Sequence, residues 1–236
     1  VYMFQVYDAG PTALAYDGNL GMALSAGDET SHTVQLGFMH TFPDGTVTDM
    51  VDVTSNGRIY PMGADTPDFS ESIAEFLGGP TAYCPFWDDM DPSAAGDVFV
   101  ETIGTVGNRE FIVQWDNVPY YNGGTSNTGT YQIVLSEATG EIAFRYDDVD
   151  FGGTGHDNGR SATIAIQNGS GISTQYSFNT TSVVAGSTLT FTPSLNTMIP
   201  LTFTLATVAD DGTEGNEDFS IDLSNPVNSI LSAVNQ

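Results

Sequence analysis

Four short runs decide the fold class: Asp97-Val98-Phe99-Val100-Glu101, Glu110-Phe111-Ile112-Val113-Gln114-Trp115, Tyr131-Gln132-Ile133-Val134-Leu135 and Glu141-Ile142-Ala143-Phe144-Arg145-Tyr146. Apolar and polar residues alternate along them, and β-branched and aromatic residues are frequent, which is typical of strands with one buried face. The stretch Ala138-Thr139-Gly140 predicts a hairpin between the last two runs, because glycine accepts the positive φ of such turns. We therefore expect an all-β protein, an antiparallel β-sandwich that is jelly-roll-like.

The same β pattern, broken by Gly, Asn, Asp and Pro clusters, extends along the chain. Only residues 70–77 have helical spacing, with Ser70 as N-cap and a Gly-Gly-Pro stop after them. Composition shifts at residues 192–196, so we expect a main domain over residues 1–193. Residues 194–236 then form a C-terminal β-hairpin or strand extension that is too short to fold alone.

The charge balance restricts the partners. The chain has 30 acidic and four basic residues, all four of them arginine, and a net charge of -26. Nucleic acids and anionic lipid surfaces are bound by clustered Lys and Arg, so we expect no nucleic-acid partner. No run reaches the ~18 apolar residues that a membrane span needs, so we expect no membrane insertion. The chain starts at Val1 without a basic and apolar leader, and we expect that any signal peptide has been removed.

Calcium is the cofactor that this composition favours, because it takes six to eight oxygen ligands and neutralises acidic surfaces. Three acidic clusters are candidate metal sites, although none has the spacing of an EF-hand. The alternative for each cluster is a solvated turn in which Asp side chains cap backbone amides. The candidate ligands are Asp88, Asp89 and Asp91, then Asp147, Asp148 and Asp150, and finally Asp210, Asp211, Glu214, Glu217 and Asp218.

Two long loops, residues 119–130 and 151–160, are the places where a β scaffold would carry a binding site. A tyrosine pair in the first loop could stack on a sugar that neighbouring polar groups hydrogen-bond. The alternative is a loop that merely contains tyrosines. The candidate ligand-binding residues are Tyr120, Tyr121, Asn122, His156 and Asp157.

Catalytic patterns are missing from the sequence, and we expect that the protein is not an enzyme. The three histidines lack zinc-ligand spacing, and no Gly-x-Ser-x-Gly motif is present. Asp88 and Asp89 should point to opposite faces of an extended segment, unlike the carboxyl pair of a glycosidase. We expect Arg109 and Arg145 to pair with nearby carboxylates such as Glu110, Glu141 or Asp147, and the lone Cys84 to be a small buried residue.

Several motifs follow one another in a characteristic order over residues 36–193. They are Leu36-Gly37-Phe38, Ser55-Asn56-Gly57-Arg58-Ile59-Tyr60, Cys84-Pro85-Phe86-Trp87-Asp88-Asp89-Met90-Asp91-Pro92, Asn108-Arg109-Glu110-Phe111-Ile112-Val113-Gln114-Trp115, Tyr131-Gln132-Ile133-Val134-Leu135 and Gly140-Glu141-Ile142-Ala143-Phe144-Arg145-Tyr146. This order resembles the nidogen-like extracellular domain and its bacterial surface relatives. The resemblance implies an extracellular, β-sandwich-like module of adhesive and matrix proteins with no known catalytic role.

The acidic stretch from Asp210 to Pro226 resembles the closing hairpin of a Calx-beta calcium-binding domain, within residues 200–231. Only the last pair of strands of such a domain would fit, and an isolated hairpin is marginally stable. It should therefore pack on the main domain or pair with a neighbouring molecule.

These features together predict an extracellular or cell-surface structural protein. We expect a self-assembling β module of a fibre or surface layer, stabilised by calcium, whose partner is another copy of itself. The alternative is a calcium-dependent adhesin or carbohydrate-binding module that recognises glycans or other surface proteins.

Overall fold

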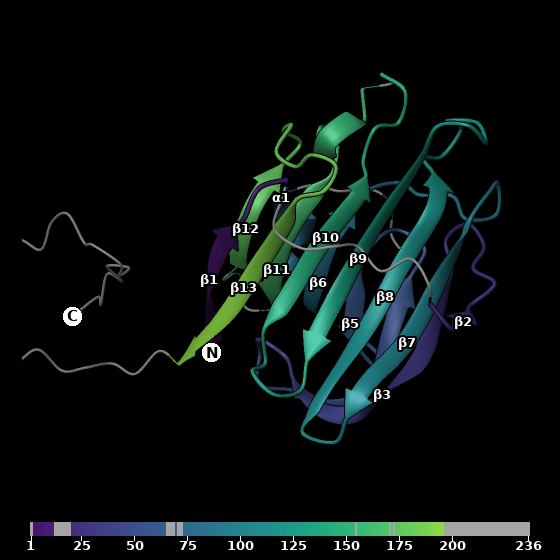
Figure 1. Cartoon of the computed structure of the whole chain (residues 1–236). Coiled ribbons are helices and arrows are strands. Elements are labelled where there is room, and N and C mark those ends of the chain that lie inside the picture. Colours follow the sequence, from purple (N-terminus) through teal and green to yellow (C-terminus); the bar gives the residue numbers. More distant parts are fainter. Residues whose placement is uncertain are drawn as a thin grey trace, which may run out of the picture. The chain divides into compact units, whose positions relative to one another are not determined.

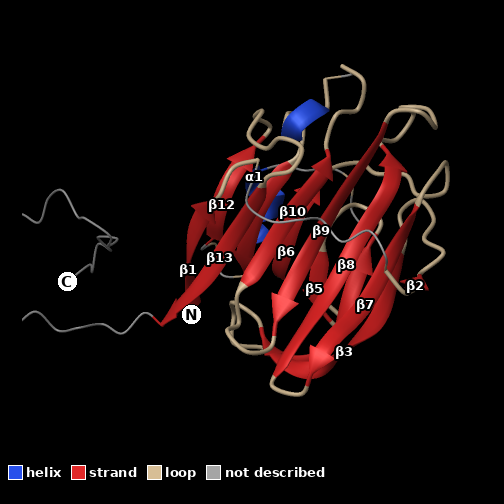
Figure 2. Ribbon diagram, viewed as in Figure 1, coloured by secondary structure: helices blue, strands red, loops and turns tan. Residues whose placement is uncertain are grey.

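The computed structural model describes residues 2–11, 20–64, 69, 73–153, 155–169, 171 and 173–195. Two antiparallel sheets pack against each other to form a sandwich, which confirms the predicted fold class (Figure 1, Figure 2). No helix in these ranges is long and apolar enough to cross a membrane.

The first sheet has seven strands, and its neighbours pair antiparallel. In spatial order the strands are β1 (Tyr2–Asp8), β13 (Thr188–Leu195), β10 (Ile142–Asp148), β9 (Thr128–Ser136), β8 (Asn108–Pro119), β7 (Asp97–Thr105) and β2 (Met22–Ala23). Apart from Glu141, which precedes β10, the four runs quoted above lie in β7 to β10, which follow one another as a meander.

The second sheet has six strands, also antiparallel. Their spatial order is β12 (Ser173–Phe178), β11 (Thr163–Asn168), β6 (Thr81–Trp87), β5 (Ile59–Pro61), β4 (Val47–Thr54) and β3 (Ser31–Thr41). The chain therefore completes β3 to β6 in one sheet before it crosses to β7 in the other.

The hairpin between β9 and β10 is confirmed. Gly140 has a φ of +68° and donates its backbone amide to Ser136 O at 3.0 Å, while Ser136 N donates to Glu141 O at 3.0 Å. A glycine at this left-handed position avoids the steric cost that a Cβ would add.

The main core lies between the sheets and is rich in aromatic residues. The ring of Trp115 stacks on Tyr131 with centroids 5.1 Å apart, and Phe86 stacks on the same tyrosine at 5.1 Å. Burying side chains of this size is the main source of the sandwich's stability.

A second, smaller cluster lies on the outer face of the six-stranded sheet, under helix α1 (Ile73–Gly78). Phe76 of α1 is fully buried there, beside Cys84 and Trp87 of β6. Both faces of β6 are therefore covered, and all seven of its residues are buried. The expected burial of Cys84 is confirmed, and burial raises the pKa of its thiol to about 12. The predicted N-cap, Ser70, lies outside the described residues.

The chain comprises a compact unit, Val1–Thr197, and a second unit, Met198–Gln236. Strand β13 runs to Leu195, two residues past the predicted end of the main domain. The expected Calx-beta-like hairpin and its acidic cluster lie outside the described residues and stay predictions.

Candidate metal and ligand site

The turn Ser55-Asn56-Gly57, between β4 and β5, organises the candidate site. Gly57 has a φ of +71°, and a Cβ there would lie 2.0 Å from the carbonyl oxygen of Phe86. Only glycine therefore lets this turn approach the end of β6. Trp115 fixes the turn from the other sheet, because its Nε1 donates to Thr54 O at 3.0 Å and to Ser55 O at 3.1 Å.

Asn56 is fully buried and joins two acidic loops. Its Nδ2 donates to Glu29 Oε1 at 3.1 Å, and its Oδ1 accepts from the backbone amide of Met90 at 2.9 Å. The loop before β3 is held to the same turn, since Ser55 N donates to Thr30 O at 2.9 Å and Thr30 N donates to Ser55 Oγ at 3.1 Å. Residues far apart in sequence thus meet at one end of the sandwich.

Three carboxylates converge where these loops meet. Oxygen atoms of Asp28, Glu29 and Asp89 all lie within 4.8 Å of one another. Burial first, and then the charges of Glu29 and Asp28, raise the pKa of Asp89 to about 6. The pKa of Asp28 is also raised, by burial and by the charge of Asp91. Glu29 has a φ of +48°, a backbone region that non-glycine residues seldom adopt.

The other predicted members of the first cluster have different roles. Asp91 Oδ1 accepts from the backbone amide of Ser93 at 3.0 Å and from the hydroxyl of Ser93, so it caps a turn. Asp88 is buried, and its Oδ1 accepts from the backbone amide of Asp89 at 2.9 Å. Its Oδ2 accepts from Ser161 Oγ at 2.5 Å, and Ser161 Oγ lies 2.6 Å from His156 Nδ1. Burial raises the pKa of Asp88.

The second predicted cluster follows the end of β10. Asp148 Oδ1 accepts from the backbone amide of Asp150 at 2.9 Å, and Asp150 Oδ1 accepts from that of Gly152 at 2.9 Å. These bonds are the capping interactions that the alternative interpretation expected. Asp147 is exposed, and a little burial together with the charges of Asp148 and Asp116 raises its pKa.

The two predicted ligand-binding loops come together beside the acidic site. The rings of Tyr120 and His156 stack with centroids 3.4 Å apart, and Tyr120 forms a β-bridge with Met90. Tyr121 N donates to Asp89 O at 2.7 Å, and the Tyr121 side chain is 41% exposed.

The remaining predicted ligand-binding residues shape these loops. Asn122 holds a φ of +57° in the turn after Tyr121, and Asp157 Oδ1 accepts from Phe151 N at 2.8 Å. Asp157 also begins the short helix η1 (Asp157–Gly159), which lies among the loops at the upper end of the sandwich in Figure 2.

Sequence reasoning missed Asp28 and Glu29. They form an isolated acidic pair before β3, and no motif links them to Asp89, some 60 residues later. The sequence feature that could have pointed to these two residues is the turn Gly27-Asp28-Glu29-Thr30, in which Gly27 N donates to Thr30 Oγ1 at 3.0 Å.

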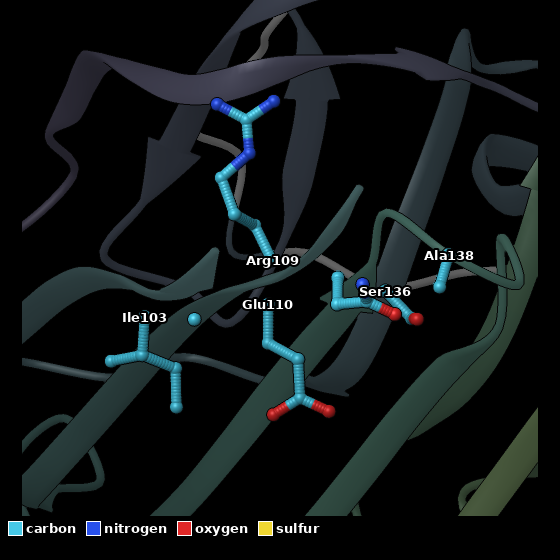
Figure 3. Close-up of a pocket in the computed structure, with 7 residues that line it drawn as sticks. Ile103, Arg109, Glu110, Ser136 and Ala138 are labelled. Atoms are coloured by element: carbon cyan, nitrogen blue, oxygen red, sulfur yellow. The ribbon is translucent and has the colours of Figure 1, made fainter. Parts of the chain in front are cut away.

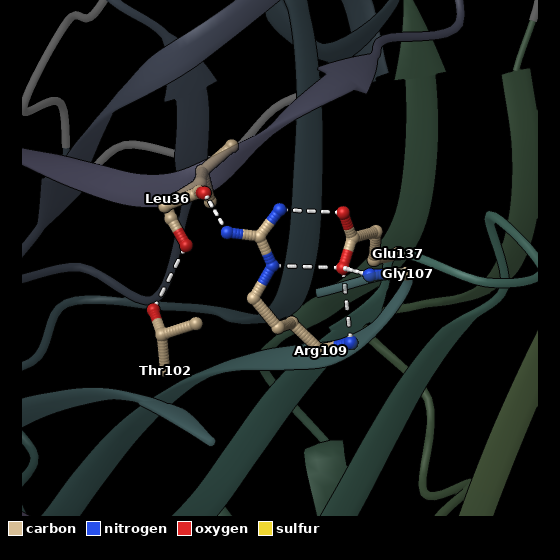
Figure 4. A network of polar contacts seen from close by, with 6 residues as sticks. Leu36, Thr102, Gly107, Arg109 and Glu137 are labelled. Carbon is tan, nitrogen blue, oxygen red and sulfur yellow. Dashed lines mark hydrogen bonds and ion pairs between the residues drawn. The ribbon is translucent and has the colours of Figure 1, made fainter. Parts of the chain in front are cut away.

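The expected pairing of Arg109 with a carboxylate is confirmed, but its partner is none of the carboxylates named above. Its guanidinium pairs with Glu137, with Nε donating to Oε2 at 2.8 Å and Nη2 to Oε1 at 2.5 Å (Figure 4). The hydrogen bonds from Arg109 hold the pKa of Glu137 down at about 2. The guanidinium of Arg58 lies over Trp87, 4.0 Å from the ring centroid.

A shallow pocket of about 240 Å³ lies beside Arg109, at the far end of β8 from the acidic site. Figure 3 shows that Arg109 and Glu110 extend in opposite directions there. The pocket is lined by Ile103, Gly104, Asn108, Arg109, Glu110, Ser136 and Ala138. None of the predicted site residues lines it.

The acidic site fits calcium by its chemistry. The three converging side chains offer only hard oxygen donors, which suit calcium or magnesium better than softer metals. Three carboxylates are fewer than the six to eight ligands of calcium, so backbone oxygens or water would complete the shell. A divalent cation would also relieve the repulsion that raises the pKa of Asp89.

An antiparallel β-sandwich with an acidic loop cluster at one end is thus the class of protein that the fold and site define. A family model described as NIDO related matches residues 4–207, which is most of the chain. The chain belongs to this family of nidogen-related domains. No curated protein and no solved structure matches it.

Proposed function

We propose that this nidogen-related domain is a non-catalytic, extracellular structural module that binds calcium at Asp28, Glu29 and Asp89 and assembles with further copies of itself. Membership of the family supports an extracellular β module. The convergence of three carboxylates on a turn built by Asn56 and Gly57 is the observation that carries the calcium site.

The same electrostatics would make self-assembly depend on calcium. At a net charge of -26, copies of the chain repel one another unless cations screen or bridge their surfaces. Calcium at the acidic site lowers that repulsion. The Calx-beta-like segment within residues 200–231 would then supply a strand or hairpin to a neighbour.

The calcium site is tested by thermal unfolding of the full chain in chelator and in calcium. Calcium at about 100 times its Kd should stabilise the wild type by about 2.7 kcal/mol. Asp89→Asn should lose most of the calcium-induced rise in Tm. Asp148→Asn is the matched control, because Asp148 caps a backbone amide outside the site, and it should keep the rise. An equal rise in Asp89→Asn and wild type would rule out this site.

A second candidate function is calcium-assisted recognition of a glycan. The observation in its favour is the exposed ring of Tyr121, whose backbone is bonded to Asp89. Tyr120 already stacks on His156, so Tyr121 is the ring that a sugar would meet. A glycan array probed with wild type and Tyr121→Ala tests this role. Equal glycan binding by the two proteins would count against it.

A further inference from the structure

The four edge strands of the sandwich differ in how easily another strand could add to them. Strand β2 has only two residues, and the registers of β3 and β12 are broken by irregularities. By contrast, β1 pairs with β13 at seven consecutive positions without a break. Bulges and very short strands are the devices by which proteins protect an edge, and β1 has neither.

The edge of β3 is further blocked by side chains from the seven-stranded sheet. Thr102 Oγ1 donates to Leu36 O at 2.8 Å, and Arg109 Nη1 donates to Gly37 O, as Figure 4 shows in part. Glu137 holds the guanidinium of Arg109 in place for this contact. Two carbonyl groups of β3 are therefore already bonded.

The pairing pattern shows which backbone groups of β1 face outward. Ala9 N donates to Thr188 O at 3.1 Å, so this pair and every second pair along the ladder exchange hydrogen bonds. The amides and carbonyls of the alternate residues, Phe4, Val6 and Asp8, then point away from β13. Among the described strands, none pairs with β1 on that side through main-chain hydrogen bonds, and β12 of the other sheet contacts β1 through a side chain, since the Tyr176 hydroxyl donates to Asp8 Oδ2 at 2.5 Å.

The chain itself contains a segment suited to this edge. Residues 201–207, Leu-Thr-Phe-Thr-Leu-Ala-Thr, carry no charge and alternate apolar with polar residues at first, which is typical of a strand. The family match extends through residue 207, so this segment belongs to the family's domain. Strand β1 has one charged residue in seven, which limits the repulsion that two acidic chains would otherwise meet.

We propose that the outer edge of β1 accepts residues 201–207 of a second copy as an added antiparallel strand. The proposal rests on the self-assembly proposed above and assigns its contact. Five residues, 196–200, separate Leu195 from this segment, so six Cα–Cα steps spanning at most about 22 Å join Leu195 to Leu201. An antiparallel return within one chain would have to cover the ~20 Å from Tyr2 to Asp8 and also cross two strand spacings of ~4.8 Å, which leaves the linker fully extended with no residue for a turn. A return within one chain would therefore run parallel to β1, whereas every strand pair described is antiparallel.

Cysteine cross-linking of the full chain tests the contact. The Val6→Cys variant is mixed, in separate experiments, with the Thr202→Cys, Phe203→Cys or Thr204→Cys variant. Each mixture is kept in calcium-containing buffer under mild oxidation. The native Cys84 is buried and should stay unreactive. One of the mixtures should give a disulfide-linked heterodimer, at a yield at least about tenfold above either variant alone.

The other outcomes overturn the assignment. A Val6→Cys homodimer would show that two β1 edges pair with each other. An intramolecular disulfide in the Val6→Cys, Phe203→Cys double variant would show that the segment pairs within its own chain. The absence of any cross-link would also overturn the contact.

A proline substitution separates this contact from self-assembly as such. Val6→Pro removes an outward amide and leaves the ladder to β13 intact, whereas Tyr7→Ala keeps every main-chain group. Val6→Pro should lower the assembled fraction at least about tenfold, and Tyr7→Ala should assemble as wild type does. If wild type and Val6→Pro assemble equally, the β1 assignment fails and self-assembly stands. If wild type never assembles and no cross-link forms, both fail.

Discussion

The amide Nδ2 of Asn56 donates a hydrogen bond to Glu29 Oε1 at 3.1 Å, although the two residues come from different loops. Because Asn56 also accepts from Met90 N, one buried side chain sets the distance between the Glu29 loop and the Asp89 loop. The candidate metal site thus depends on the fold of the turn beside it.

Replacing Asn56 with alanine should destabilise the domain by about 2–3 kcal/mol, because a buried amide of Met90 loses its acceptor. The substitution should also weaken calcium binding, since Glu29 loses the donor that holds it. Urea unfolding measures the first effect, and a calcium titration by calorimetry the second. Asn127→Ala is the control, because its bond to Gly123 O lies outside the acidic site; equal losses in both variants would contradict the role of Asn56.

Gly57→Ala should cost at least about 3 kcal/mol or prevent folding, because the new Cβ would meet the Phe86 carbonyl at 2.0 Å in a left-handed backbone. Gly124 also has a positive φ of +79°, but nothing lies within 4 Å of its Cβ position. Gly124→Ala should therefore cost only about 1 kcal/mol. Denaturant midpoints compare the two variants, and similar costs would show that contact with β6 is unimportant.

The raised pKa of Asp89 makes stability depend on pH. With a pKa of about 6 in the folded state and 3.8 ordinarily, the folded chain holds a proton that the unfolded chain has released. The free energy of unfolding should therefore fall, through this group, as pH rises from about 4 to about 6. Asp89→Asn should flatten that slope in chelator, as measured by Tm against pH. An unchanged slope would contradict the shift.

The titration of Asp89 should also be visible as proton release on calcium binding. Binding at pH 6 should release roughly half a proton per ion, and at pH 8 almost none, because the site must be deprotonated to bind. Calorimetry in buffers of different ionisation enthalpy measures the release. Equal proton release at pH 6 and at pH 8 would contradict the assignment to Asp89.

Glu137 should give the opposite pH dependence. Its folded pKa of about 2 lies below the ordinary 4.5, so the stability it contributes is present above about pH 4.5 and is lost as pH falls toward 2. Glu137→Gln should lower Tm at pH 5 and converge with wild type near pH 2. Glu101→Gln removes the same charge away from Arg109; a similar effect of both changes would attribute the result to net charge.

Much of the sandwich could be predicted because its strands are locally encoded. The runs in β7 to β10 alternate, and Gly140 marks their hairpin. The residues of β6 do not alternate between apolar and polar, because α1 covers the outer face of this strand. No pattern within β6 itself predicts that packing. The wrong partner of Arg109 has a similar cause: Glu110 pairs with Ser136, which places Arg109 opposite Glu137, and this register is not visible in either strand alone.

The acidic site was predicted only in part for the same reason. Asp88 and Asp89 follow a buried strand, which made them visible as a cluster. Asp88 joins a buried pair with Ser161, whereas Asp89 joins a partly exposed group with Glu29, and this separation depends on loops that tertiary contacts bring together.

Sedimentation velocity of the full chain in about 10 mM calcium, a concentration well above sensor-class affinities, and then in excess chelator tests the central claim most directly. A calcium-bridged structural module should sediment as large species that dissociate to monomers on chelation, and Asp89→Asn should assemble less. A monomer in both buffers would contradict the account.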